Sequence, residues 1–316
     1  MAGPAAIVAP GNPLLGLAQR WLCVALLGAI GMYGSEMLFW SAPPSPVLPG
    51  ELALTWLAYA LATAAALMAM AATGARGWLE VFLAGCIYGW LTEGVVVQTV
   101  YDVFPYTLVF TGMSWHALLT ALLIGLAVRR AANWSLPRQL LFLLALGLFY
   151  GLWAQYWPLE RPALPPPLTV ALYLCGLGLC VPLANLALDY LPPRLAFSKW
   201  EIIFVAALFV VLWGAQFLAT PEPQRLAVPL AIAAILWLLH RLGSGQQGVD
   251  LGNTPPPLRW RHWLFLLVPA LATALAVVGW AGLRGIETNW PIAIATSLLA
   301  LGLCGLAGVR AIAGRR

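Results

Sequence analysis

The chain has 316 residues, of which 62% are hydrophobic and 9% charged, and its formal net charge at pH 7 is +5. Soluble domains carry about 25% charged residues, so this composition excludes an ordinary soluble protein. The 16 basic residues are scattered among short polar segments and form no patch, so we expect no nucleic-acid partner. We therefore expect the chain to lie in a membrane, with membrane lipids as its partners.

The apolar segments are continuous and do not alternate with period two. Only helices and closed barrels satisfy every backbone group inside hydrocarbon, and barrel strands alternate. The first apolar segment follows Arg20, contains Glu36 and ends without a small-residue cleavage site, which favours a retained span over a signal peptide. We therefore predict an all-α, polytopic integral membrane protein that forms one transmembrane domain over residues 1–316.

A spanning helix needs about 20 apolar residues, and Pro, Gly and charged residues divide the chain into ten such windows. They are residues 21–42, 52–73, 78–100, 106–128, 138–157, 167–188, 199–219, 226–242, 262–283 and 290–310. Residues 1–20 precede the first window. The longest polar segment, residues 243–260, is rich in Gly and Pro and predicts a flexible linker loop.

Basic residues predict which side of the membrane each loop faces. All but three of the 16 lie on the side of both termini, and the three exceptions are Arg161, Arg225 and Arg284. The positive-inside rule then places both termini, residues 1–20 and the loop 243–260 in the cytoplasm. We expect a multi-pass protein of the plasma membrane.

An aromatic–glycine pair recurs in alternate spans and is followed by a carboxylate or carboxamide. The pairs are Tyr33-Gly34 before Glu36, Tyr88-Gly89 before Glu93, Tyr150-Gly151 before Gln155, and Trp213-Gly214 before Gln216, with a weaker echo at Gly279-Trp280. This pattern predicts five helix-hairpin repeats in parallel orientation. Helix packing against glycine and anchoring by interfacial aromatic residues explain the same pattern without a site.

Two acids and one histidine fall inside the predicted spans: Glu36, Glu93 and His116. A charge in hydrocarbon is costly and marks a candidate functional site. Each of these residues could also have a purely structural role, as a group at the membrane interface or in helix packing. Glu93 and His116 flank one short loop, so antiparallel helices place them at similar depth. His240 and His262 sit at predicted helix ends and are expected to be interfacial.

The loop between Glu93 and His116 is the richest polar and aromatic segment of the chain. We predict Glu93 and His116 as candidates for catalysis. The candidate substrate-binding residues are Glu36, Glu93, Gln98, Tyr101, Asp102, Trp115, His116, Gln155 and Gln216. No motif for a soluble cofactor, and no His, Cys, Asp or Glu spacing typical of a metal site, occurs in the sequence, so we expect neither a cofactor nor a metal.

These residues favour a membrane transporter, or translocating binding protein, for a small, partly apolar or lipid-like solute in an outward-facing polar chamber. The alternatives are a membrane-embedded enzyme, with Glu93 and His116 as its acid–base pair in a hydrolase or transferase acting on lipid, and a non-catalytic structural subunit of a membrane complex. Ten spans with both ends inside is also the layout of small drug/metabolite transporters, whose motifs are absent. The Glu–His pair is similar to that of prenyl-processing intramembrane proteases, but their double-Glu and Phe-x-x-x-His patterns are missing.

Overall fold

The computed structural model describes residues 13–44, 46–161, 163–192, 194–243, 249–250, 256–282 and 285–314. Within these ranges, ten helical segments are long and apolar enough to cross a membrane. They are Leu14–Trp40, Pro49–Thr73, Trp78–Val96, Leu108–Ala131, Leu136–Glu160, Pro167–Leu188, Lys199–Ala219, Pro223–Leu242, Arg259–Gly282 and Asn289–Ala313. The predicted all-helical, polytopic architecture is confirmed.

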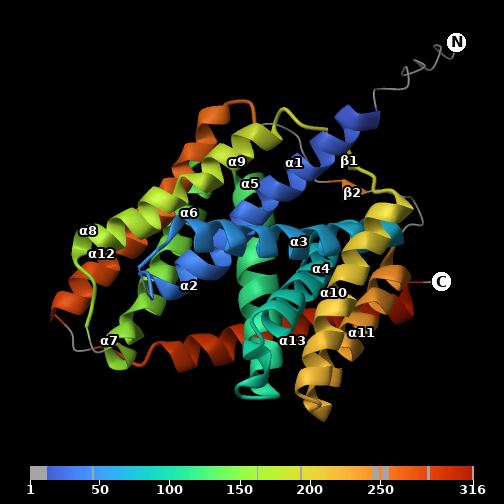
Figure 1. Cartoon of the computed structure of the whole chain (residues 1–316). Helices are drawn as coiled ribbons and strands as arrows, with labels where there is room; N and C mark the ends of the chain where they lie inside the picture. Colours follow the sequence, from blue (N-terminus) through green and yellow to red (C-terminus); the bar gives the residue numbers. More distant parts are fainter. Residues whose placement is uncertain are drawn as a thin grey trace, which may run out of the picture.

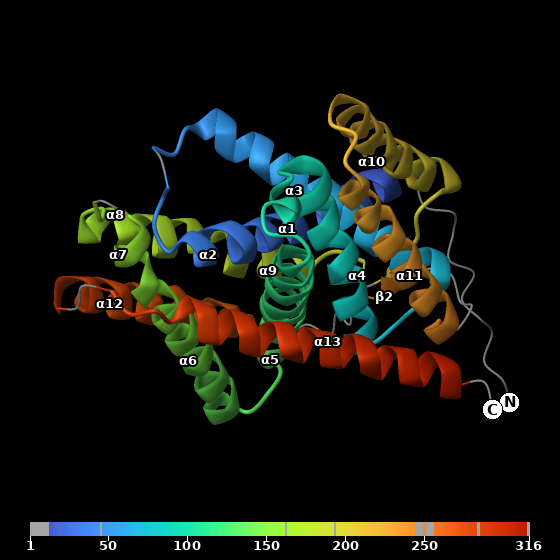
Figure 2. The same cartoon turned by 90° about the horizontal axis from the view of Figure 1, so that it is seen from below.

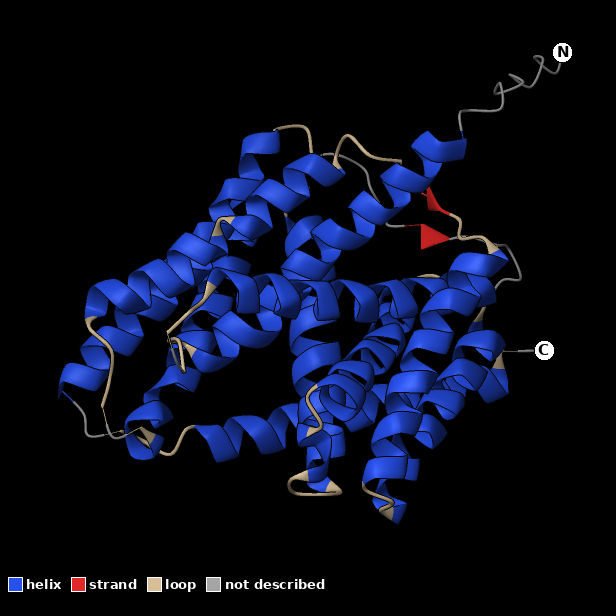
Figure 3. Cartoon of the chain, viewed as in Figure 1, coloured by secondary structure: helices blue, strands red, loops and turns tan. Residues whose placement is uncertain are grey.

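Figure 3 shows that helices make up nearly all of the described chain. In chain order they are α1 (Pro13–Met32), η1 (Tyr33–Met37), α2 (Leu38–Trp40), α3 (Pro49–Thr73), α4 (Trp78–Leu91), η2 (Thr92–Val96), η3 (Thr99–Tyr101), η4 (Leu108–Ala127), α5 (Val128–Ala131), α6 (Leu136–Trp153), η5 (Ala154–Tyr156), α7 (Trp157–Glu160), α8 (Pro167–Ala171), η6 (Leu172–Gly176), α9 (Cys180–Leu188), α10 (Lys199–Ala219), η7 (Pro223–Leu226), α11 (Ala227–Leu242), η8 (Arg259–Leu266), α12 (Leu267–Gly282) and α13 (Asn289–Ala313). Strands β1 (Arg194–Leu195) and β2 (Val249–Asp250) form one antiparallel pair.

Two predicted polar segments fall partly outside this description. Residues 1–12 lie outside the described residues, and α1 already begins at Pro13. In the predicted linker 243–260, residues 244–248 and 251–255 lie outside the described residues, Val249–Asp250 forms β2, and η8 begins at Arg259.

The helix η4 lies at the centre of the molecule. In Figure 1 it runs vertically through the middle, and Figure 2 shows it end-on while α13 passes across it lengthwise. Helices α6, α9 and α12 gather on one side of η4, and α10 and α11 on the other (Figure 1). Side chains of η4 therefore have access to several other spans.

Local chemistry explains where individual helices begin and end. A capping box opens α10, in which Ser198 Oγ accepts from the Glu201 N–H and the Glu201 carboxylate accepts from the Ser198 N–H. The same carboxylate accepts from Arg20 at 3.1 Å and from the Trp21 indole, which ties α10 to α1. Helix α3 ends where Gly74 takes a left-handed conformation with φ of 67°, which glycine adopts without steric cost.

Three spans contain π-helical turns at the positions of their polar residues. Glu36 lies in η1, Glu93 in η2 and His116 in η4, and all three elements are π-helical. π-Helical turns are rare and frequently occur at functional sites. Because such a turn is wider than an α-helical turn, it changes the direction of the side chains beyond it.

The four glycines of the predicted repeat have different surroundings. A Cβ on Gly89 would lie 2.4 Å from the Gly112 carbonyl oxygen, one on Gly34 would lie 2.9 Å from Thr120 Cγ2, and one on Gly151 would lie 2.5 Å from Leu275 Cδ1. A Cβ on Gly214 would meet nothing within 4 Å. Close helix packing thus applies to three of the four glycines, and the parallel hairpin repeat stays a prediction.

This difference predicts opposite outcomes for two alanine substitutions. Gly89→Ala should lower the free energy of unfolding by about 1–3 kcal/mol, because its methyl group overlaps a backbone oxygen. Gly214→Ala should leave it unchanged or raise it by up to about 1 kcal/mol through higher helix propensity. Unfolding in mixed micelles measures both values, and equal effects of the two substitutions would contradict the packing described for Gly89.

Candidate functional site

Four titratable side chains from four spans meet next to η4, and we call them the carboxyl–imidazole cluster: Glu36, Tyr59, Glu93 and His116. Tyr59 Oη donates to Glu36 Oε1 at 2.5 Å. His116 Nε2 lies 3.3 Å from Glu93 Oε1 and 3.4 Å from Tyr59 Oη. Glu36 is half-buried and the other three are buried, so the structure brings three of the sequence-predicted residues into one contact network.

The hydrogen bonds of His116 define its tautomer. Nδ1 lies 2.8 Å from the Thr111 carbonyl oxygen, which can only accept, so Nδ1 carries a hydrogen and donates. Nε2 then faces the Glu93 carboxyl group. One shared proton is needed there: a neutral carboxyl group donates to Nε2, or an imidazolium donates to a carboxylate. The contact between Glu93 and His116 therefore requires one proton between the carboxyl group and Nε2.

The ends of the cluster are also hydrogen-bonded. Trp40 Nε1 donates to Glu36 Oε2 at 3.0 Å, and the Thr99 hydroxyl donates to Glu93 Oε2. The result is a line of polar contacts that begins in the first span, passes through Tyr59 and His116, and ends in the loop after η2. Such a line can relay a proton between groups that do not touch each other directly.

A layer of hydroxyl groups borders the cluster. Ser35 Oγ lies 3.0 Å from Tyr88 Oη and donates to Thr120 Oγ1 at 3.2 Å. The Tyr88 ring is 5.6 Å from the His116 ring and 5.7 Å from the Tyr59 ring, centroid to centroid. This hydroxyl layer (Ser35, Tyr88 and Thr120) therefore packs directly against the cluster.

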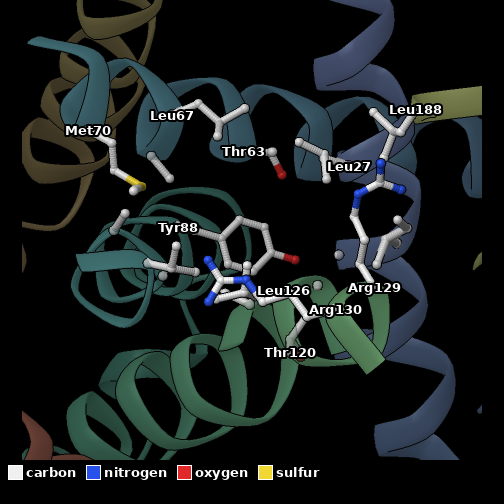
Figure 4. Close-up of a pocket in the computed structure, with 18 of the residues that line it drawn as sticks. Leu27, Thr63, Leu67, Met70, Tyr88, Thr120, Leu126, Arg129, Arg130 and Leu188 are labelled. Atoms are coloured by element: carbon white, nitrogen blue, oxygen red, sulfur yellow. The ribbon is translucent and has the colours of Figure 1, made fainter. Parts of the chain in front are cut away.

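A cavity of about 140 Å³ begins at the hydroxyl layer and lies between α1, α3, α4 and η4 (Figure 4). Tyr88 and Thr120 of the hydroxyl layer line this cavity, and so do Arg129 and Arg130, which follow η4 in the chain. Most of the remaining lining is aliphatic. Neither Glu93 nor His116 is among the lining residues, so the described cavity reaches the cluster only through the hydroxyl layer.

Three predicted residues of the loop between η2 and η4 have other surroundings. Gln98 Oε1 accepts from Arg225 Nη1 at 2.8 Å, and the Arg225 guanidinium lies 4.9 Å from the centre of the Tyr101 ring. Asp102 is exposed. Gln98 and Tyr101 thus hold the buried Arg225 of η7 against the loop, next to the cluster but not within it.

The other predicted residues are Gln155, Gln216 and Trp115. Gln155 Nε2 donates to the carbonyl oxygens of Gly151 and Leu275, which places Gln155 at the α6–α12 contact. Gln216 Nε2 donates to the carbonyl oxygen of Val95 in η2. Trp115 packs 4.7 Å, centroid to centroid, from Trp153 in an aromatic group. In the described part of the chain, no hydrogen bond joins these three to the cluster.

Sequence reasoning missed Tyr59, which links Glu36 to His116. Its segment, Ala58-Tyr59-Ala60, lies in a span that is otherwise mostly Ala, Leu and Met. A tyrosine hydroxyl in the middle of such a span needs a partner. That isolated hydroxyl was the available signal.

A second polar group, which we call the Asp189 cluster, was also missed. Asp189 Oδ1 accepts from Arg129 Nη2 at 2.8 Å, Oδ2 accepts from His262 Nε2 at 3.0 Å, and Arg259 Nε lies 3.9 Å away. His262 is 4% exposed, so its ring contacts protein groups and not water, and its depth at the membrane interface stays a prediction. Its helix packs against α9, which brings it onto a carboxylate and out of water.

Within the residues that the structure describes, no group of three or more His, Cys, Asp and Glu side chains is arranged to hold a metal ion. Comparison with protein-family models, with curated proteins and with solved structures finds no match to this chain.

Proposed function

We propose that this protein is a membrane transporter for a small, partly apolar solute, and that the carboxyl–imidazole cluster binds and releases the proton that drives transport. The observation that carries this proposal is the contact of Glu93 with His116 at 3.3 Å around one shared proton. Intramembrane carboxylates and histidines mark proton relays in pumps and transporters. Each of the two residues lies in a π-helical element.

The position of the cavity favours transport over catalysis. A lipid-directed enzyme needs its acid–base groups in contact with the substrate, but neither Glu93 nor His116 lines the described cavity. A transporter needs only an energetic connection between the proton site and the solute site. The hydroxyl layer, through Tyr88, provides such a connection because it lines the cavity and packs against His116.

A purely structural subunit fits the cluster less well. Well-packed apolar residues usually stabilise a protein as well as, or better than, buried charged pairs. Four titratable groups meeting inside one helical domain are therefore better explained by proton binding than by stability. We take the cavity lined by Arg129 and Arg130 as the solute chamber. It is mostly aliphatic and lies toward the side predicted to be cytoplasmic, so it differs from the outward-facing polar chamber predicted from the sequence.

The proposal predicts that Glu93→Gln abolishes coupled proton movement and preserves the fold. The Gln amide can still donate to His116 Nε2 and accept from Thr99, but it cannot exchange the proton. Liposomes that contain the purified protein and a pH-sensitive dye should report proton flux when benzenesulfonate, benzyltrimethylammonium or phenyl glucoside is added. We expect at least one probe to drive flux, and the variant to lose about 100-fold or more of the rate.

Glu51→Gln is the matched control, because it removes an exposed carboxylate at the start of α3 outside the cluster. It should transport protons at the wild-type rate. If wild-type and Glu93→Gln liposomes behave alike with every probe, the proposed function is wrong.

A further inference from the structure

The cavity between α1, α3, α4 and η4 combines an aliphatic wall with a cationic end. Hydroxyl groups of Thr63, Tyr88 and Thr120 are its polar contacts away from that end. Figure 4 shows the Thr63 hydroxyl pointing into the space between α3 and η4. A ligand with a neutral polar surface would find few partners here, whereas an apolar group with one charged end matches the lining.

The two arginines at the cationic end differ in what they bind. Arg129 is buried and donates to Asp189 at 2.8 Å and to the Asn185 carbonyl oxygen at 2.9 Å, so its charge is balanced within the protein. Arg130 is exposed, and no ion pair joins its guanidinium to another described residue. Figure 4 shows the two side chains diverging, with Arg130 on the Tyr88 side of the cavity. Arg130 is thus the cation available to a ligand.

The size of the cavity limits the apolar part of that ligand. Its volume is about 140 Å³, similar to an engineered apolar cavity of about 150 Å³ that binds benzene. An apolar group of about six carbon atoms therefore fits this volume. A diacyl phospholipid exceeds it.

We propose that this cavity binds a single-tailed amphipathic anion, with a carboxylate, sulfonate or phosphate group on Arg130 and an apolar group of about six carbons along the aliphatic lining. A guanidinium matches these oxyanions in charge and geometry. The identification of this anion as the transported solute rests on the proposed function, but the binding site itself does not. Tyr88 and Thr120 line the same cavity, so the bound anion lies next to the hydroxyl layer.

Calorimetry on the purified full-length protein in an uncharged detergent tests the site with three probes that share one ring. Benzenesulfonate should bind, and benzyltrimethylammonium and phenyl glucoside should bind at least about tenfold more weakly, because they cannot pair with a guanidinium. Arg130→Ala should weaken benzenesulfonate binding about tenfold or more, and Arg130→Lys should weaken it less, because the charge remains but the guanidinium geometry is lost. Equal binding of the sulfonate and the ammonium probe would overturn the proposal.

Two further variants distinguish binding inside the cavity from nonspecific attraction of the anion to basic residues. Thr63→Phe fills the space between α3 and η4 and should abolish binding, whereas Arg138→Ala removes an exposed arginine that does not line the cavity and should change nothing. Thermal unfolding of each variant checks that it is folded. If Thr63→Phe is folded and still binds benzenesulfonate at full affinity, the ligand is not in this cavity.

The same titration distinguishes a soluble anion from a lipid headgroup. Hexyl phosphate should displace benzenesulfonate, and dioleoyl phosphatidate in nanodiscs should compete no better than dioleoyl phosphatidylcholine. Strong competition by phosphatidate alone would assign the cationic end to lipid and overturn the proposal. Calorimetry measures binding without proton flux, and the liposome assay measures proton flux, so this site and the proton-coupled function fail in separate experiments.

Discussion

Replacing Glu93 or His116 by alanine is expected to lower the free energy of unfolding by about 3–5 kcal/mol in each case. The two side chains are 3.3 Å apart and both are buried, so removing one leaves the other without its partner in a low-dielectric environment. The double alanine variant removes both groups and leaves no such orphan. It should therefore be clearly less damaged than the sum of the single variants.

Unfolding of the four proteins in mixed micelles measures the interaction energy, which we expect to be about 1–3 kcal/mol. The control cycle pairs His116→Ala with Gln155→Ala, because Gln155 is hydrogen-bonded at the α6–α12 contact and should not interact with His116. That control should be additive within about 0.5 kcal/mol. Additive losses for Glu93 and His116 would make them two unrelated buried polar residues and remove the basis of the proton site.

Glu93→Gln separates the structural role of this contact from its role in proton transfer. The amide is isosteric with the carboxyl group and satisfies the same neighbours, so the unfolding free energy should change by about 1 kcal/mol or less. A stable variant without proton flux would locate the function in the exchangeable proton. A variant as unstable as Glu93→Ala would show that the amide cannot replace the carboxyl group in packing.

The membrane-spanning architecture was predictable because the length and apolarity of a segment largely decide whether it can span a bilayer. The windows 167–188 and 199–219 coincide with the observed spans, and the first span begins at Leu14 rather than at residue 21. The charge of Arg20 predicts a boundary there, but its guanidinium pairs with Glu201 of α10. A tertiary partner let the helix continue through a charged residue.

The adjacency of Glu93 and His116 in depth also followed from the sequence, because a short loop joins their spans. Whether the two side chains face each other depends on helix rotation, which the sequence does not fix, and no sequence pattern indicated the π-helical elements in which both residues lie. Tyr59 is remote from both in the chain, so its place between Glu36 and His116 could not be derived from spacing. Pairings of this kind depend on how whole helices pack.

The Asp189 cluster was even less predictable from the sequence, because its hydrogen-bonded residues come from three spans or their ends. Arg129, Asp189 and His262 are separated in sequence by 60 and 73 residues. Each one, taken alone, was a charged or polar residue near a predicted helix end, where water is the ordinary partner. Only the packing of η8 against α9, and the hydrogen bonds of Arg129 in α5 to Asn185 and Asp189, bring the three side chains together.

Asp189→Ala is expected to be among the most destabilising single substitutions, with a loss of about 3–5 kcal/mol in the free energy of unfolding. The Asp189 side chain is fully buried and accepts hydrogen bonds from Arg129 and His262, so its removal leaves a buried guanidinium without its counter-ion. Asp189→Asn keeps an acceptor for Arg129 and should lose less.

Asp102→Ala is the matched control, because Asp102 is exposed and its removal should change the free energy of unfolding by no more than about 0.5 kcal/mol. Unfolding of the three variants in mixed micelles gives the comparison. If Asp189→Ala is no less stable than Asp102→Ala, Arg129 must have found water or lipid phosphate in place of the carboxylate. In that event the end of the cavity next to Arg129 is more hydrated than the contacts of Asp189 indicate, and both arginines, not Arg130 alone, would be open to an anionic ligand.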